Sequence, residues 1–133
     1  MTENLQVLLA DDSEVVRRRL GTMITEIPGV ELVGEAADVA DALEAIERLQ
    51  PDLVIVDLHM PGNGLRLVEI VGRRKVKPTI VVLTNYPYEQ YRDRCLTAGA
   101  EFFFDKATEL DSVVEVLSDL ANPVEPRAPH YGI

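Results

Sequence analysis

The chain has 133 residues, of which 47% are hydrophobic and 27% are charged, and its formal net charge is −10. This size and composition fit one soluble globular domain with one core, and the acidic balance argues against direct nucleic-acid binding, which needs basic surface to displace counterions. Cys95 is the single cysteine, so a disulfide within the chain is excluded, and with two histidines the chain is a poor source of zinc ligands.

The ends of the chain and its apolar runs bear on location. The first residues carry no basic segment ahead of an apolar run, so they do not resemble a signal peptide. No stretch approaches the roughly 20 apolar residues that a membrane-spanning helix needs. We therefore expect a cytoplasmic protein without membrane contact.

Short apolar runs of strand length alternate with amphipathic segments of helical period. In chain order, the pattern predicts strand 5–10, helix 13–27, strand 30–36, helix 38–49, strand 52–58, helix 64–74, strand 79–85, helix 87–99, strand 101–105 and helix 109–121. Such alternation is typical of an α/β protein with a doubly wound parallel sheet. We predict five parallel strands with five helices distributed over both faces.

Several residues mark the expected helix boundaries. Ser13 and Asp38 are suited to cap the first and second helices, and Pro28-Gly29 should end the first. Pro87 fits the first turn of the fourth helix, and Gly99 fits its end.

The C-terminal residues differ in composition from the rest. The segment NPVEPRAPHYGI, residues 122–133, holds three of the eight prolines and shows no periodicity. We therefore predict a folded domain over 1–121 and a flexible tail over 122–133, which is too short to form a second domain.

Five polar residues follow or end the predicted strands. They are Asp11 and Asp12 after the first strand, Asp57 near the end of the third, Thr84 in the fourth and Lys106 after the fifth. Ligands of an open parallel sheet bind outside the carboxyl ends of its strands. We therefore expect these side chains to converge on one edge of the sheet.

This set of side chains suits phosphoryl transfer. Three close carboxylates repel one another unless a counter-charge is present, and Mg2+ prefers oxygen ligands and readily combines carboxylates with phosphate oxygens. Lys106 supplies a further positive charge, and the Thr84 hydroxyl can donate to a phosphoryl oxygen. The set predicts a site in which the Asp57 carboxylate is the nucleophile.

Four segments together resemble the receiver (REC) domain of bacterial two-component response regulators. They are LLADDSEVVRRRL, PDLVIVDLHMPGNG, VVLTN and GAEFFFDKA, and the resemblance covers about residues 5–121. It implies the strand order 2-1-3-4-5. It also implies a phosphorylation-switched signalling module that catalyses only its own phosphorylation and dephosphorylation.

The resemblance assigns roles to individual residues. Asp57 matches the phosphoacceptor and Lys106 the invariant lysine. The implied Mg2+ ligands are Asp11, Asp12, Asp57 and the backbone carbonyl of His59. Thr84 matches the switch hydroxyl, and Phe103 matches the aromatic switch residue.

The resemblance also implies partners. A sensor histidine kinase or a histidine phosphotransfer protein would donate the phosphoryl group. A downstream protein would bind the face formed by the fourth helix, fifth strand and fifth helix, and a homodimer is compatible with this scheme.

The chain departs from the usual receiver pattern at three positions. Gly64 comes one residue early in the loop after Asp57, Ala107 replaces the common proline after the lysine, and Asn85 follows Thr84 where a smaller residue is usual. With alanine at 107, a cis peptide bond at that point is not expected.

Other side chains have simpler interpretations. Arg17, Arg18 and Arg19 are expected on a solvated helix face, and His59 in an exposed loop. Cys95 should pack on the fourth helix. Because a strand alternates its faces, Phe103 should lie opposite its phenylalanine neighbours.

Three alternative functions compete with a stand-alone receiver. A flavin-binding electron carrier would need a hydroxyl- and glycine-rich phosphate loop, where this chain has the acidic DDSE. An aspartyl-phosphate hydrolase generally has a second acid two residues after its nucleophile, where this chain has His59. The receiver portion of a longer DNA-binding regulator fits the proline-containing tail, although the ending APHYGI favours a stand-alone receiver.

Overall fold

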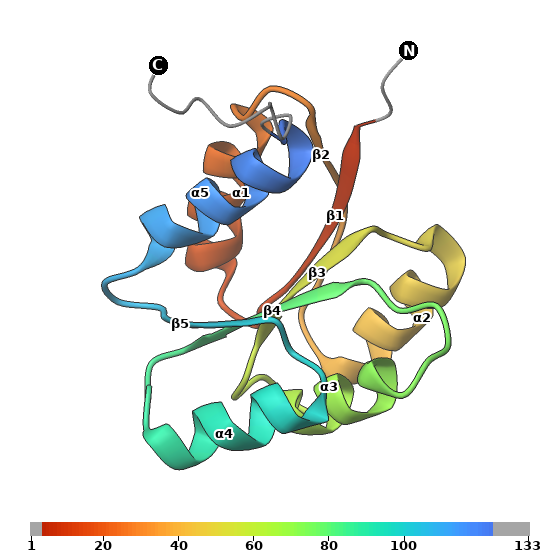
Figure 1. The fold of residues 1–133 in the computed structure, drawn as a ribbon, viewed down its shortest axis with the longest axis vertical. Coiled ribbons are helices and arrows are strands. Elements are labelled where there is room, and N and C mark those ends of the chain that lie inside the picture. Colours follow the sequence, from red (N-terminus) through yellow and green to blue (C-terminus); the bar gives the residue numbers. More distant parts are fainter. Residues whose placement is uncertain (1–3, 124–133) are drawn as a thin grey trace, which may run out of the picture.

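The computed structural model describes residues 4–123 of the chain. Five parallel strands form one sheet in the order β2-β1-β3-β4-β5, and five helices pack on it (Figure 1). The predicted fold class and strand order are confirmed. Residues 124–133 of the predicted tail lie outside the described residues, so the division at residue 121 stays a prediction.

The elements lie close to their predicted positions. The strands are β1 (Leu5–Ala10), β2 (Val30–Ala36), β3 (Leu53–Asp57), β4 (Thr79–Thr84) and β5 (Phe102–Asp105), and the helices are α1 (Glu14–Thr25), α2 (Val39–Leu49), α3 (Gly64–Gly72), α4 (Glu89–Ala98) and α5 (Leu110–Ala121). α1 ends two residues earlier than predicted. There the N–H of Ile27 donates a hydrogen bond to the carbonyl of Ile24 at 3.1 Å, in a turn that buries Ile27 before the chain enters β2.

Most of the predicted helix boundaries are confirmed. Ser13 accepts a hydrogen bond from the N–H of Val16, and Asp38 accepts one from the N–H of Asp41. Gly99 ends α4 with φ of 119°, a left-handed conformation that favours glycine.

The prediction for Pro87 was wrong. α4 begins at Glu89, and Pro87 lies ahead of the helix. The reason is Tyr88, which is the N-cap and has an extended backbone with φ −75° and ψ 143°. Its N–H bonds to the carbonyl of Tyr86 at 2.7 Å, so a tight turn takes the place of the expected first helical turn.

The sheet has a core on each face. α1 and α5 cover one face, and α2, α3 and α4 cover the other (Figure 1). Successive strand residues alternate between the two layers, so that Leu8 and Val54 face α2–α4 while Leu9 and Ile55 face α1 and α5. In β5, Phe103 packs on the opposite side from Phe102 and Phe104, as the alternation predicts.

α4 makes a close backbone contact with α3 at its C-terminal end. A side chain at Gly72 would overlap the carbonyl oxygen of Ala98, and a methyl group on Gly99 would lie 3.1 Å from the Cα of Gly72. Glycine therefore permits the backbones of α3 and α4 to touch. Cys95 is the one fully buried residue of α4, which confirms its predicted packing role, and no side chain caps the N-terminus of this helix.

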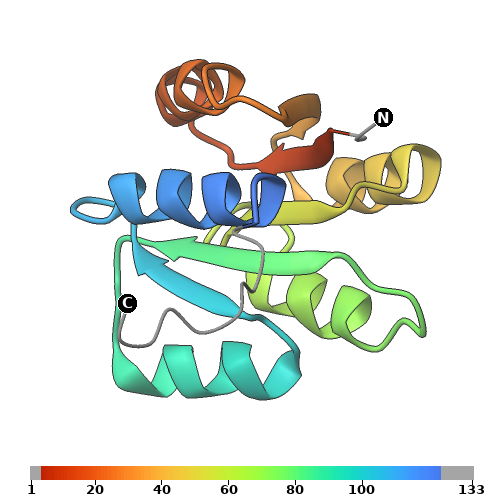
Figure 2. The same ribbon diagram turned by 45° about the horizontal axis from the view of Figure 1, so that its top comes forward.

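The carboxyl ends of the parallel strands share one edge of the sheet. Figure 2 shows β4 and β5 running side by side, with their arrowheads at the loops that lead to α4 and α5. Among the described residues, no helix is long and apolar enough to cross a membrane.

Candidate functional site

Asp57 ends β3 and is buried, with 4% of its surface exposed. One of its carboxylate oxygens accepts a hydrogen bond from the N–H of His59 at 3.2 Å. The loop that follows turns back closely, because the N–H of Gly64 donates to the carbonyl of Leu58 at 3.0 Å. A side chain at Gly64 would overlap the Asp57 and Leu58 carbonyls. The early glycine therefore gives a compact loop that holds Asp57 at the edge of the sheet.

Lys106 joins two of the predicted carboxylates. Its Nζ lies 2.7 Å from Asp11 Oδ2 and 3.3 Å from Asp57 Oδ2, and its side chain is 7% exposed. The backbone N–H of Lys106 donates to the carbonyl of Thr84 at 2.8 Å, which fixes the lysine to the end of β4. The ammonium group is therefore held between Asp11 and Asp57. The peptide bond between Lys106 and Ala107 is trans.

Asp11, Asp12 and Asp57 form a cluster that fits a hard cation. One carboxylate oxygen from each lies within 4.8 Å of the others. Asp11 is fully buried and its Oδ1 accepts from the N–H of Ser13 at 2.8 Å. Its Oδ2 lies 2.7 Å from the ammonium nitrogen of Lys106. Three close carboxylates, which offer only oxygen ligands, suit Mg2+.

The acidity of Asp57 reflects its burial and its acidic neighbours. Burial raises the pKa of its carboxyl group above the ordinary value, and the charge of Asp11 and a hydrogen bond with Asp12 raise it further. Lys106 and the His59 N–H act in the opposite direction but do not cancel this effect. A bound divalent cation would favour the ionised carboxylate.

Thr84 and Phe103 lie on neighbouring strands. Thr84 is fully buried, and its Oγ1 accepts from the N–H of Tyr86 at 2.9 Å, which leaves the hydroxyl proton available for another acceptor. Asn85 is exposed, so its side chain is not packed against the core. Phe103 is half-buried and pairs with Val82, two residues before Thr84 on β4.

An aromatic cluster connects the loop after Asp57 with α4. The ring of His59 lies 5.1 Å from that of Tyr86 and 5.6 Å from that of Tyr91, edge-on in both cases. His59 is exposed, as predicted. The ring contacts were not predicted, because spacing along the chain does not specify side-chain direction across two loops.

The expectation of a solvated face was wrong for Arg17. Its Nη1 donates to the carbonyl of Asp11 at 2.7 Å, and its Nε lies 3.3 Å from a carboxylate oxygen of Glu35. Arg18 and Arg19 are exposed as expected. Helical periodicity places the backbone of Arg17 at the margin of the buried face, and the long side chain then reaches both strand ends.

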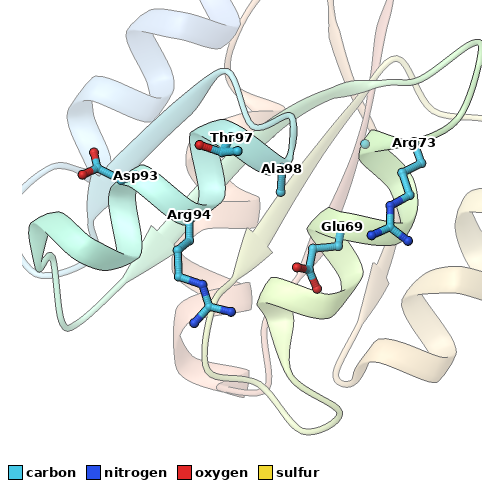
Figure 3. Close-up of a pocket in the computed structure, with 7 residues that line it drawn as sticks. Glu69, Arg73, Asp93, Arg94, Thr97 and Ala98 are labelled. Carbon is cyan, nitrogen blue, oxygen red and sulfur yellow. The ribbon is translucent and has the colours of Figure 1, made fainter.

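A separate groove of about 530 Å³ lies between α3 and α4. Figure 3 shows Glu69 on α3, Arg73 just after its end and Arg94 on α4 around this groove, while Asp93 points away from α3. Its lining is of mixed charge and includes none of Asp11, Asp12, Asp57, Thr84 and Lys106. The buried carboxylates of Asp11 and Asp57 and the ammonium group of Lys106 lie at the carboxyl edge of the sheet, outside this groove.

This fold and this edge define a class of protein. A doubly wound sheet of order 2-1-3-4-5 with an aspartate cluster and a lysine at its carboxyl edge is the arrangement of a receiver domain. Residues 7–118 match the family described as the response regulator receiver domain, and the chain belongs to that family.

Individual relatives agree with the family match. The chain is 35% identical over 108 residues to a protein-glutamate methylesterase/protein-glutamine glutaminase of Treponema pallidum (strain Nichols), covering 79% of this chain and 27% of the relative. It is 31% identical over 120 residues to the nitrate/nitrite response regulator protein NarL of Escherichia coli (strain K12), covering 90% of this chain and 56% of NarL. The chain thus spans little more than half of NarL and about a quarter of the methylesterase.

A solved structure extends the comparison to three dimensions. The isolated REC domain of RcsB from Salmonella enterica serovar Typhimurium, determined in the presence of phosphomimetic BeF3−, superposes with a TM-score of 0.81 at 25% identity. The match covers 89% of this chain and 88% of that domain.

Proposed function

We propose that Asp57 accepts a phosphoryl group and that this event switches the surface formed by α4, β5 and α5. The observation that carries the proposal is the position of Lys106, whose ammonium group contacts both Asp57 and the buried Asp11. Membership of the receiver family makes signalling through an aspartate the class of function. The assignment to Asp57 rests on its place at the end of β3 within this cluster.

The chemistry uses the groups already described. An oxygen of the Asp57 carboxylate forms a bond to phosphorus, and the bond from phosphorus to the donor nitrogen of a phosphohistidine breaks, with the electron pair and a solvent proton going to that nitrogen. Lys106 and the Thr84 hydroxyl would bind phosphoryl oxygens. The donor would be a sensor histidine kinase or a histidine phosphotransfer protein.

Mg2+ fits the oxygens of Asp11, Asp12 and Asp57, and the backbone carbonyl of His59 is the proposed fourth protein ligand. When bound there, Mg2+ would offset the charge of the carboxylates and of the incoming phosphoryl group. Asp11 contributes a fully buried carboxylate to this site, whereas Asp12 is exposed and reaches it from the solvent side.

The proposed signal path runs from Asp57 through Thr84 to Phe103. The Thr84 hydroxyl would donate a hydrogen bond to a phosphoryl oxygen and move towards Asp57. The Phe103 side chain on β5 would then repack into the space that Thr84 leaves. One charge-assisted hydrogen bond contributes roughly 1.5–3 kcal/mol, whereas a nearly complete switch needs about 5.5 kcal/mol. We therefore propose a graded shift of the α4–β5–α5 surface, which would bind a downstream protein.

Intact mass spectrometry after treatment with acetyl phosphate and Mg2+ tests the proposal. The wild-type chain should gain one phosphoryl group, and Asp57→Asn should gain none. Asp52→Asn is the matched control, because Asp52 is exposed and bonds the N–H of Gln6 at the other end of the sheet. Labelling of Asp57→Asn to the wild-type extent would show that another residue is the acceptor.

A further inference from the structure

Arg17 links α1 to the ends of two strands. Its guanidinium group donates to the carbonyl of Asp11 at 2.7 Å and lies 3.3 Å from the Glu35 carboxylate, near the end of β2. The arginine side chain is 20% exposed, whereas Glu35 is 45% exposed. Arg17 therefore reaches the backbone of the acidic loop, and most of its side chain is shielded from water.

We propose that Arg17 is a positioning residue that directs the carboxylate of Asp12 towards the metal-binding position. The carbonyl of Asp11 belongs to the planar peptide that joins Asp11 to Asp12, so a bond to this oxygen fixes the plane from which Asp12 extends. The N–H of Asp11 is held as well, by the carbonyl of Ala36 at 2.9 Å. The inference deepens the proposed function and rests on it.

The charge of Arg17 and its positioning role predict opposite effects on the affinity for Mg2+. As a cation near the cluster, the arginine would weaken the binding of a divalent cation, so its removal would tighten binding if charge alone mattered. As a positioning residue it pre-orients a ligand, and its removal should weaken binding. Loss of a group that orients a metal ligand commonly costs about 10- to 100-fold in metal affinity. The sign of the change therefore separates the two roles.

The experiment is a Mg2+ titration of the full chain followed by backbone amide NMR. Arg17→Ala should raise the dissociation constant for Mg2+ about tenfold. Arg17→Lys keeps the charge but loses the planar group with its fixed donors, so it should also weaken binding, by a smaller factor. Arg18→Ala is the matched control, since Arg18 is exposed and pairs with Glu14 on its own helix. This control should bind Mg2+ within about twofold of wild type.

Two further measurements separate positioning from general destabilisation. Urea unfolding without Mg2+ reports whether each variant folds. If Arg17→Ala does not fold, the Mg2+ affinity of Arg17→Lys is the test of the proposal. Glu35→Gln removes the ion pair but leaves the bond to the Asp11 carbonyl, so it should change Mg2+ affinity less than threefold, on the order of an exposed ion pair.

Three results would overturn the inference. Arg17→Ala could bind Mg2+ as tightly as wild type or more tightly, both Arg17 variants could match Arg18→Ala, or Glu35→Gln could weaken binding as much as Arg17→Ala. Failure of the proposed function itself would look different, because the wild-type chain would then bind no Mg2+ and Asp57 would not be labelled.

Discussion

Replacing Lys106 with methionine should destabilise the metal-free protein strongly. The substitution keeps the apolar stem of the side chain but removes the ammonium group from between two buried carboxylates at 2.7 and 3.3 Å. With an effective dielectric constant near 20, these contacts correspond to attractions of about 6 and 5 kcal/mol before desolvation. Desolvation of the lysine offsets several kcal/mol of this, and removing one partner of a buried pair typically costs 3–5 kcal/mol.

We therefore expect Lys106→Met to lower the free energy of unfolding by about 3–5 kcal/mol at neutral pH without Mg2+. For a domain of this size the loss corresponds to a fall in Tm of roughly 10–20 °C. Urea unfolding followed by circular dichroism measures the first quantity and calorimetry the second. Lys77→Met is the matched control, because Lys77 pairs at 2.9 Å with the half-exposed Glu101. The control should lose no more than about 1 kcal/mol.

The loss of unfolding free energy caused by Lys106→Met, called the deficit below, should also depend on pH and Mg2+. The pKa of Asp57 is already raised by burial and by Asp11, and loss of the ammonium group should raise it further. Between the ordinary and the raised pKa the folded state binds more protons than the unfolded state, so stability falls as pH rises through that window and recovers as pH is lowered. Mg2+ should reduce the deficit by replacing the lost charge. A deficit as small as that of Lys77→Met, or one that neither acid nor Mg2+ reduces, would refute this reasoning.

Four further outcomes follow from the described contacts. Asp57→Asn should stabilise the metal-free protein at neutral pH, because the pKa of Asp57 is raised and its charged form is disfavoured in the fold; the gain in urea unfolding should disappear as pH falls towards the ordinary carboxyl range. Thr84→Ala should still accept a phosphoryl group, but the NMR shift changes on α4 and α5 should shrink towards the unphosphorylated pattern, and undiminished shifts would point to another route. His59→Ala and Tyr86→Ala should each change the rate of dephosphorylation, followed by loss of the phosphorylated mass, while lost ring contacts cost only about 0.5–1.5 kcal/mol of stability; unchanged lifetimes in both would contradict this. Gly72→Ala should cost about 1–3 kcal/mol or more in urea unfolding, because the new methyl group meets the Ala98 carbonyl, and a neutral effect would show that α3 and α4 separate easily.

The strands were predictable because they are short apolar runs bounded by turn residues. Each of the five lies within one residue of its expected position, since a strand buried on both faces tolerates few polar residues. Helix ends were less predictable, because local backbone geometry determines them. Pro87 is compatible with a first helical turn, but the extended backbone of Tyr88 starts the helix later. The sequence shows which residues can form a turn and not which competing turn forms.

The site was predictable where the backbone alone places a residue. Asp57 ends β3 and Lys106 follows β5, and the carboxyl ends of these parallel strands share one edge of the sheet, so the topology brings the two residues together. Arg17 and the ring contacts of His59 were not predicted, because long or aromatic side chains reach partners that no periodicity specifies. The departure at Gly64 is accommodated by close backbone contact, which neither spacing nor composition reveals.

The glycine contact between α3 and α4 has a consequence for local unfolding. α4 buries one residue fully and lacks a side-chain cap at its N-terminus, whereas its C-terminal end is fixed by Gly72 and Gly99. Opening this helix from Glu89 releases Tyr91 from the core but leaves the sheet intact, so it needs less free energy than unfolding the sheet. Amide hydrogens should exchange with solvent fastest near the start of α4 and more slowly towards Ala98. One of the two helices of the proposed output surface can thus open from its N-terminal end while the sheet stays folded.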